Sequence, residues 1–448
     1  MRLSLTSPQS RAPNPNRRRG DRQREIGPTA LNQVCEITLP WGAWYLDGAH
    51  QLALPERCHV DVLDAGDISP CPLQAVHAAI ASPCDGTPLV ARARGSRSAC
   101  VVVDDLARPT PASAVLPFII EQLNEAHIAA EAIHIVVATG SHGMLDNRQL
   151  AWKVGPDVLA RYDVKCHDCQ SGLAPSGVTY GSRELKINRT FLEADFKMTI
   201  GSVLPHSFAG YSGGAKMVLP GLADLAATAR SHKFVQLGLR GGTDPNSNRF
   251  RLEAEDLARR LGLQFCVNVV TNRRREIVGV FAGDLVTAHR EACRLAEQAF
   301  RTRVLKTYDC LLINAYPKDI DLIQAENAFV ALKTARAPLV HDGGVIILAT
   351  AASEGLGCHG LFQPGGASYQ APQRKRAFGN RELWLYAPSV TTDDVHQLYW
   401  EGYPVLHNPD ELKAALARRF PGPAAVGVLP CGPMQQIDDL REGIARVA

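Results

Sequence analysis

Short apolar runs alternate with amphipathic stretches along most of the chain. SACVVVDD predicts a buried strand, and ASAVLPFIIEQLNEA, whose apolar residues recur at helical spacing, predicts a helix behind it. IHIVVATG and FKMTIGSV repeat the strand pattern, and a helix is expected between them, from about Asp146 to Leu159. Strands that alternate with helices indicate a mostly parallel sheet with helices on both faces, so the expected fold class is α/β.

The rhythm changes near residue 264. QFCVNVVTNRRREIVGVFAGD predicts two strands joined by a charged turn, and VTAHREACRLAEQAFR predicts a helix behind them. YDCLLINAYP, GGVIILATAA and RELWLYAPSV then predict a second set of strands, with ENAFVALKTA as a helix between them. We therefore expect two α/β domains with mostly parallel sheets, residues 31–268 and 269–448, and an active-site cleft between them. Residues 1–30 are arginine-rich without a following apolar segment, which predicts a disordered extension.

Composition narrows the class of protein. With 46% hydrophobic and 21% charged residues, the chain of 448 residues has the balance of a soluble globular protein. Its net charge is only +3 and aromatic residues make up 6%, so no basic stripe with interleaved aromatics indicates a nucleic-acid partner. No apolar run approaches the roughly 18 residues of a membrane span. Twelve scattered cysteines, often beside apolar residues, indicate a reduced cytoplasmic protein.

Polar residues follow three of the predicted strands, where open α/β sheets bind their ligands. The segments are VVVDDLARPTP, VVATGSHG and TIGSVLPHSFAGYSGGAK. Asp104 and Asp105 in the first segment equally fit a helix-capping role. In the third, SGGAK resembles a phosphate-binding loop, in which backbone N–H groups and Lys216 face an anion. The loop has neither Walker A spacing nor GxGxxG, so the residues alone predict a mononucleotide or other phosphorylated ligand beside His206.

The segment CHDC, residues 166–169, offers a different chemistry. A CxxC pair binds zinc or exchanges disulfides, but a zinc site needs a second pair and the chain has no second CxxC. A structural role, or a role for His167 alone, is therefore favoured.

Several segments together resemble lactate racemase and its homologues, the enzymes that use the nickel-pincer nucleotide cofactor. The likeness runs from about residue 98 to 360, and it is carried by VVVDDLARPTP, VVATGSHG, INRTFLEADFKMTIGSVLPHSFAGYSGGAKMVLPG, and VFAGD with AHREAC. The resemblance implies an isomerase that racemises or epimerises a 2-hydroxy acid by hydride transfer to the cofactor, through a 2-keto acid. It also implies two partners, a small 2-hydroxy acid and the enzymes that make the cofactor.

The resemblance assigns roles to individual residues. His206 matches the protein ligand of nickel, and square-planar Ni(II) accepts an imidazole as a fourth donor. His142 matches one catalytic base, His167 is the candidate for the second, and Arg108 resembles the clamp on the substrate carboxylate. The residues expected near the cofactor are Asp105, Thr110, Arg189, Ser212, Gly213, Gly214, Lys216 and Gln324, with Lys333 as a further candidate.

Two positions depart from the family pattern. Arg189, in INRTF, stands where the lactate enzyme has the lysine that tethers its cofactor, and a guanidinium is a poor nucleophile, so we expect noncovalent binding. Asn327 stands three residues after Gln324, where the lactate enzyme has a lysine for its substrate. A larger or dicarboxylic hydroxy acid such as malate is therefore expected in place of lactate.

Two alternatives stay open from the sequence. A non-catalytic nucleotide- or phosphate-binding α/β protein explains the glycine-rich loop but leaves His142 and His206 without a role. A zinc or thiol redox protein built on CHDC explains only those four residues.

Overall fold

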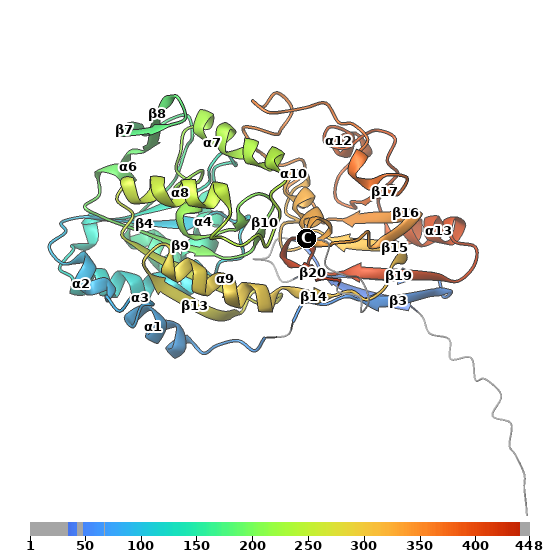
Figure 1. The fold of residues 1–448 in the computed structure, drawn as a ribbon, viewed down its shortest axis with the longest axis horizontal. Helices are drawn as coiled ribbons and strands as arrows, with labels where there is room; N and C mark the ends of the chain where they lie inside the picture. The colour runs from blue at the N-terminus through green and yellow to red at the C-terminus, as the bar shows by residue number, and fades with distance from the viewer. Residues whose placement is uncertain (1–34, 43–47, 67, 440–448) are drawn as a thin grey trace, which may run out of the picture. The chain divides into compact units, whose positions relative to one another are not determined.

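A computed structural model describes residues 35–42, 48–66 and 68–439, all of which belong to the unit Val34–Ala448. The extension predicted for residues 1–30 lies outside the described residues. Two six-stranded sheets carry the fold of this unit (Figure 1), and the predicted α/β class is confirmed. In the part of the chain described, no helix is both long and apolar enough to cross a membrane.

The first sheet has the strand order β13-β12-β9-β4-β5-β6, and all neighbours are parallel except β12 and β13. Its strands are β4 (Ala99–Asp104), β5 (Ile133–Ala138), β6 (Asp163–Cys166), β9 (Phe196–Ser202), β12 (Phe265–Thr271) and β13 (Ile277–Gly283). Each strand that the apolar runs predicted here is present. The two strands expected near residues 264–284 form an antiparallel pair, because a short charged turn joins them.

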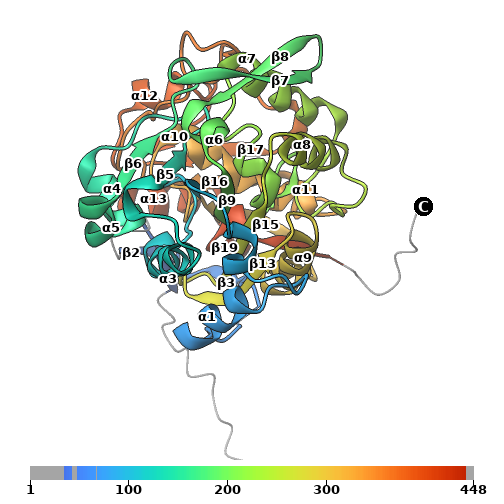
Figure 2. The ribbon, with the colours of Figure 1, turned by 90° about the vertical axis from the view of Figure 1, so that its left-hand side faces the viewer.

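Alternate residues of the strands pack into different cores. Val101 and Val103 of β4 face one core, and Cys100 and Val102 face the other. The first core packs against α1 (Leu73–Ala81), α2 (Leu89–Ala93), α3 (Ala112–Glu125), α4 (Asn147–Val154) and α5 (Pro156–Arg161). The second packs against the hairpin β7 (Leu173–Tyr180)–β8 (Arg183–Asn188), α6 (Arg189–Glu193), α7 (Leu225–His232) and α8 (Arg249–Arg260). Figure 2 shows α1 and α3 on one side of this sheet and α7 with the β7–β8 hairpin on the opposite side.

The second sheet is parallel throughout, with the order β18-β17-β16-β15-β19-β3. Its strands are β3 (Cys58–Val62), β15 (Tyr308–Asn314), β16 (Val340–Ala349), β17 (Glu382–Tyr386), β18 (Val405–Leu406) and β19 (Ala424–Leu429). One face packs against α10 (Leu322–Ala325), α11 (Val330–Thr334) and α12 (Thr392–His396). The other face packs against the hairpin β1 (Cys35–Pro40)–β2 (Ala49–Leu54) and α13 (Pro409–Arg419).

Smaller elements complete the described chain. The two-residue strands β10 (Pro205–His206) and β11 (Gly210–Tyr211) form a short hairpin, and β14 (Arg301–Arg303) pairs with β20 (Gln436–Asp438). Helix α9 (Thr287–Ala299), predicted from the sequence, packs on β12 and β13.

Two predicted helices differ in detail. The stretch expected as one helix, Asp146 to Leu159, forms α4 and α5, because Gly155 adopts a φ of +92° and Pro156 starts the second helix. The stretch ENAFVALKTA begins as a 3₁₀ turn, Glu326–Phe329, before α11.

The sheets do not follow the division of the chain at residue 268. That position lies inside β12, and its partner β13 comes after it. Strand β3, near the start of the described chain, pairs in parallel with β19 near its end. Each sheet therefore contains segments from both sides of the expected boundary.

Candidate functional site

A cavity of about 940 Å³ is lined by segments that follow strands of both sheets. The segments after β4, β5 and β9 contribute Asp105, His142 and His206, and those after β15 and β16 contribute Gln324 and His359. The loops after β5 and β16 are joined directly: the Gly143 N–H donates to the Cys358 carbonyl at 3.2 Å, and the Gly360 N–H donates to the Ser141 carbonyl at 2.7 Å. This pairing brings the two sets of polar residues to one cavity.

A histidine and a carboxylate form the most definite polar pair of the cavity. Asp105, directly after β4, accepts a hydrogen bond from Nδ1 of His142, directly after β5. Burial alone would raise the pKa of Asp105, but the charge and hydrogen bond of His142, and then Arg108, lower it well below its usual range. The carboxylate is therefore ionised and holds the Nδ1–H form of His142. Nε2 of the ring, 3.2 Å from the Gln324 amide nitrogen, is left as the basic atom.

The partner of Nε2 is itself held in place. Gln324 lies in α10, and its backbone N–H donates to Oδ1 of Asp321, the N-cap of that helix, at 2.7 Å. The Asn327 amide nitrogen donates to the backbone carbonyl of Gln324 at 2.8 Å and to its side-chain Oε1 at 3.3 Å. Sequence reasoning did not identify Lys318 as a residue of the site. Its side chain is buried, and its Nζ donates a hydrogen bond to Oδ1 of Asn327 at 3.3 Å. Its position in YPKD, just after β15, follows the same rule of polar residues after strands that identified the other segments.

His206 lies at the end of β10, opposite Gly210 of β11, with the edge of Phe208 against its ring. Burial lowers the pKa of His206 well below its usual range, and the charges of Lys216, Lys318 and Arg108 add to the effect. The imidazole is therefore neutral, and its Nδ1 accepts a long hydrogen bond from the Ala209 N–H at 3.4 Å. In residues 35–42, 48–66 and 68–439, no three His, Cys, Asp or Glu side chains gather to hold a metal ion by themselves.

Hydrogen bonds to β9 and β12 hold the glycine-rich loop that contains Ser212, Gly213 and Gly214. Ser212 Oγ donates to the Ser202 carbonyl at 2.6 Å, and the Gly214 N–H donates to Oδ1 of Asn268 at 3.0 Å. Gly213 and Gly214 have φ values of +76° and +55°. A Cβ on Gly213 would lie 3.0 Å from Oδ1 of Asn268, and one on Gly214 would lie 3.1 Å from Cδ2 of His289. The glycines are thus required by backbone conformation and packing, and the Gly214 N–H is already bonded within the protein.

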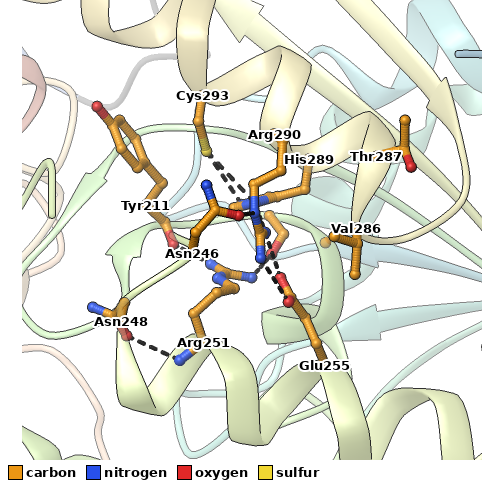
Figure 3. Close-up of polar contacts among 12 residues, drawn as sticks. Tyr211, Asn246, Asn248, Arg251, Glu255, Val286, Thr287, His289, Arg290 and Cys293 are labelled. Carbon is orange, nitrogen blue, oxygen red and sulfur yellow. Dashed lines mark hydrogen bonds and ion pairs between the residues drawn. The ribbon is translucent and has the colours of Figure 1, made fainter. Parts of the chain in front are cut away.

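A buried arginine binds the carbonyl oxygens of this loop. Arg251 of α8 is fully buried and donates to the carbonyls of Tyr211 and Gly213, the latter at 2.9 Å. Figure 3 shows its guanidinium beside His289 of α9, whose Nε2 lies 2.9 Å from the Ser212 carbonyl oxygen. The loop is therefore anchored to two helices by its carbonyl oxygens.

The cavity has an excess of positive charge. Arg108, Lys216 and Lys333 line it, and among the described residues none of them forms an ion pair. The acidic side chains of the cavity are already paired: Asp104 with Lys153, Asp105 with His142, and Glu326 with Lys375. Burial lowers the pKa of Lys216 well below its usual range, and repulsion by Arg108 adds to this. Such a cavity favours an anionic ligand.

The structure brings together most of the residues expected at the site. Those that line the cavity are Asp105, Arg108, His142, His206, Ser212, Gly213, Lys216, Gln324 and Lys333. His232 and His359, which sequence reasoning missed, line it as well. Their signals were weak, since neither directly follows a predicted strand.

Four expected residues do not line the cavity. Thr110 is fully buried and its hydroxyl donates to Asp104, because the turn after β4 folds back on that carboxylate. His167 is buried with Nε2 3.1 Å from the Ala223 carbonyl oxygen, and burial lowers its pKa to about 4. Arg189 is exposed at the start of α6, where its guanidinium lies 3.5 Å from a carboxylate oxygen of Glu193. Gly214 packs against the ring of His289.

The chain is similar to known proteins over much of its length. A sequence model described as the lactate racemase N-terminal domain matches residues 45–240. A lactate racemase of Thermoanaerobacterium thermosaccharolyticum is 28% identical over 282 residues, which are 60% of this chain and 64% of that enzyme. A lactate racemase of Lactiplantibacillus plantarum is 28% identical over 295 residues, 64% of this chain and 68% of that enzyme. The first match therefore spans less than two thirds of its relative.

Solved structures share the fold. The lactate racemase apoprotein from Thermoanaerobacterium thermosaccharolyticum superimposes with a TM-score of 0.72 at 22% identity, over 90% of this chain and all of that chain. A protein from Thermotoga maritima superimposes with a TM-score of 0.62 at 17% identity, over 83% of this chain and all of that chain.

Proposed function

Because the chain belongs to the lactate racemase family, we propose that it racemises or epimerises a 2-hydroxy acid. The observation that carries the proposal is the pair of Asp105 and His142, which presents a basic nitrogen to a cavity that also holds a neutral His206. A histidine whose Nδ1 is hydrogen-bonded to an ionised carboxylate is the arrangement used in general-base catalysis, and a binding protein has no need of it.

The chemistry of a 2-hydroxy acid explains this arrangement. Its α-proton is hard to remove, because the carbanion would form next to a carboxylate. The carbanion is avoided if a base removes the hydroxyl proton while the α-carbon loses its hydrogen as hydride. This route requires a base at the hydroxyl oxygen. Nε2 of His142 takes that proton while Asp105 stabilises the resulting imidazolium. Arg108, in the same cavity, binds the substrate carboxylate with two parallel hydrogen bonds.

The residues present fit the family's nickel-pincer nucleotide. The cavity of about 940 Å³ has room for a mononucleotide and a small acid, and its unpaired cations suit a phosphate. His206 would hold the metal, whose other donors the cofactor carries, and Ser212, Gly213 and Lys216 would hold the nucleotide. When bound, the cofactor would accept the hydride and return it to either face of the keto acid.

Inversion requires a base on each face of the substrate. His142 serves one face. His167 stays the prediction for the other, with its unpartnered Nδ1 as the reactive atom, although it does not line the cavity in this structure. A larger or dicarboxylic substrate such as malate is proposed because Asn327, which lines the cavity, replaces the family's lysine, and because Lys333 offers a further cation.

The test uses protein produced together with the cofactor-making enzymes, with its nickel content confirmed. It is incubated with single-enantiomer 2-hydroxy acids, including lactate and malate, and the loss of optical rotation is followed. We expect racemisation of at least one acid, and none with His142→Gln at equal nickel content. Nickel-loaded protein that racemises no acid of the panel would favour the non-catalytic nucleotide-binding protein.

A further inference from the structure

A chain of hydrogen bonds leads from a buried amine to the proposed base. Lys318 Nζ donates to Oδ1 of Asn327, the Asn327 amide nitrogen donates to Oε1 of Gln324, and Nε2 of Gln324 lies 3.2 Å from Nε2 of His142. Asp105 ends the chain at Nδ1 of the imidazole. Lys318 has no carboxylate partner in the described part of the chain, and it does not line the cavity.

The two ends of this chain determine its direction. Lys318 donates to an amide oxygen in either charge state of the amine, so Asn327 turns Oδ1 toward it. The backbone carbonyl of Gln324 only accepts, and it holds the Asn327 amide nitrogen at 2.8 Å. Asn327 is therefore anchored at both ends of its amide, and its nitrogen must donate to Oε1 of Gln324. The Gln324 amide nitrogen then faces His142 as a donor.

The opposite orientation of Gln324 places two donors together. If its amide flipped, the nitrogen of Gln324 would face the nitrogen of Asn327, and one N–H group of the half-buried Asn327 would lose its acceptor in the protein. Of the two orientations, only the observed one gives the N–H of Asn327 that faces Gln324 an acceptor. It requires a lone pair on Nε2 of His142, because the amide nitrogen of Gln324 cannot accept a proton from an imidazolium.

We propose that Lys318 and Asn327 are positioning residues that hold Nε2 of His142 unprotonated, by fixing the direction of the hydrogen bond from Gln324. The inference rests on the proposed function only where it treats His142 as a base. The incoming substrate hydroxyl then displaces the Gln324 amide and meets a nitrogen that is ready to accept its proton.

The test is a double-mutant cycle on cofactor-free protein. The pKa of His142 is measured from its ring ¹⁵N chemical shifts in the wild type, Asn327→Leu, Gln324→Leu and the double variant. Asn327→Leu frees Gln324 to turn its oxygen toward an imidazolium, so we expect the pKa of His142 to rise by about one unit, the effect of one hydrogen bond. In the Gln324→Leu background the same substitution should have no effect. An equal shift in both backgrounds, or no shift in either, would overturn the inference.

Two substitutions of Lys318 can be compared without any difference in charge between them. Lys318→Gln and Lys318→Met both lose the amine, but only the glutamine can still donate to Oδ1 of Asn327. We expect a higher pKa of His142 in Lys318→Met than in Lys318→Gln, and equal values would contradict the proposal. This pair also decides the matter if Asn327→Leu does not fold. The other titratable groups that act on His142 are unchanged in all variants: Asp105, His232, Asp321 and His359.

The outcome is separable from that of the proposed function. If the cycle shows coupling and no acid is racemised, only the racemase proposal fails. If acids are racemised and the cycle shows no coupling, only the roles of Lys318 and Asn327 fail.

Discussion

Two adjacent aspartates at the end of β4 have different roles. Asp104 is buried, lies 2.6 Å from Nζ of Lys153 and accepts the Ser202 N–H at 3.0 Å. Asp105 binds His142 in the cavity. Both residues line the cavity, but they have different partners. The carboxylate of Asp104 therefore ties β4 to Lys153 and Ser202, whereas that of Asp105 holds His142.

Paired substitutions should separate these roles. Asp105→Asn removes the charge that stabilises protonated His142, and we expect racemisation to fall about 100-fold or more. Asp104→Asn removes the carboxylate charge that lies 2.6 Å from Nζ of the buried Lys153, and we expect it to lower the free energy of unfolding by about 3 kcal/mol. Racemisation rates and urea unfolding of both variants provide the test, and full activity of Asp105→Asn would remove Asp105 from the mechanism.

The same pair predicts a pH dependence of stability. The folded-state pKa of Asp105 is lowered, so the stability contributed by its ionised form is complete above about pH 4, the unfolded value. It is lost as the pH falls toward the folded-state pKa. The difference in unfolding free energy between wild type and Asp105→Asn should therefore shrink below pH 4, and a difference independent of pH would contradict the assignment.

The proposed metal ligand can be tested apart from the proposed base. His206→Ala removes the single protein ligand proposed for nickel, so we expect the purified variant to contain no nickel and to racemise nothing. His142→Gln should keep nickel and lose only racemisation. Metal analysis of both proteins, with circular dichroism to confirm folding, gives the result, and nickel retained by His206→Ala would refute its role.

At the level of elements, the glycine-rich loop is a structural unit as much as a binding loop. Arg251 of α8 and His289 of α9 (Figure 3) bind its carbonyl oxygens. Asn268 of β12 accepts a hydrogen bond from the Gly214 N–H. The sequence explained the glycines by the needs of a ligand. Contacts with α8, α9 and β12 require them as well, and no local pattern reveals such contacts.

A matched glycine pair should show this. Gly214→Ala places a Cβ 3.1 Å from the His289 ring at a φ of +55°, whereas Gly343→Ala has a φ of +71° and nothing within 4 Å. Both substitutions carry the left-handed backbone cost of about 1–2 kcal/mol. We expect Gly214→Ala to lower the free energy of unfolding further, by about 1 kcal/mol or more, since overpacking adds to that cost. Equal losses in urea unfolding would show that the packing against His289 can relax.

At the level of the whole molecule, the position of Arg189 bears on how the cofactor is held. Its side chain is 58% exposed, pairs with Glu193 on the surface of α6 and does not line the cavity. A guanidinium is also a poor nucleophile. In the function proposed above, we therefore expect the cofactor to be held noncovalently by His206, Lys216 and the other polar groups of the cavity.

Denaturing intact-protein mass spectrometry tests this. Protein of confirmed nickel content should release the whole nucleotide on unfolding and give the mass of the unmodified polypeptide. The same sample under native conditions serves as the control and should retain the added mass. An adduct that persists after denaturation, mapped to Lys186 or Lys197, would show a covalent anchor.

Local patterns in the sequence determined the α/β class, most strands of both sheets, and the segments that carry Asp105, His142 and His206. Apolar runs and polar residues after strands are visible without knowing what lies beside them. Only the tertiary structure decided which of these residues meet. In it, β3 pairs with β19, and Lys318 contacts Asn327. Thr110, His167 and Arg189 do not line the cavity, although the sequence predicted them at the site. Parallel pairing and side-chain contacts join segments that are far apart in the chain, and for that reason no short stretch of sequence contains them.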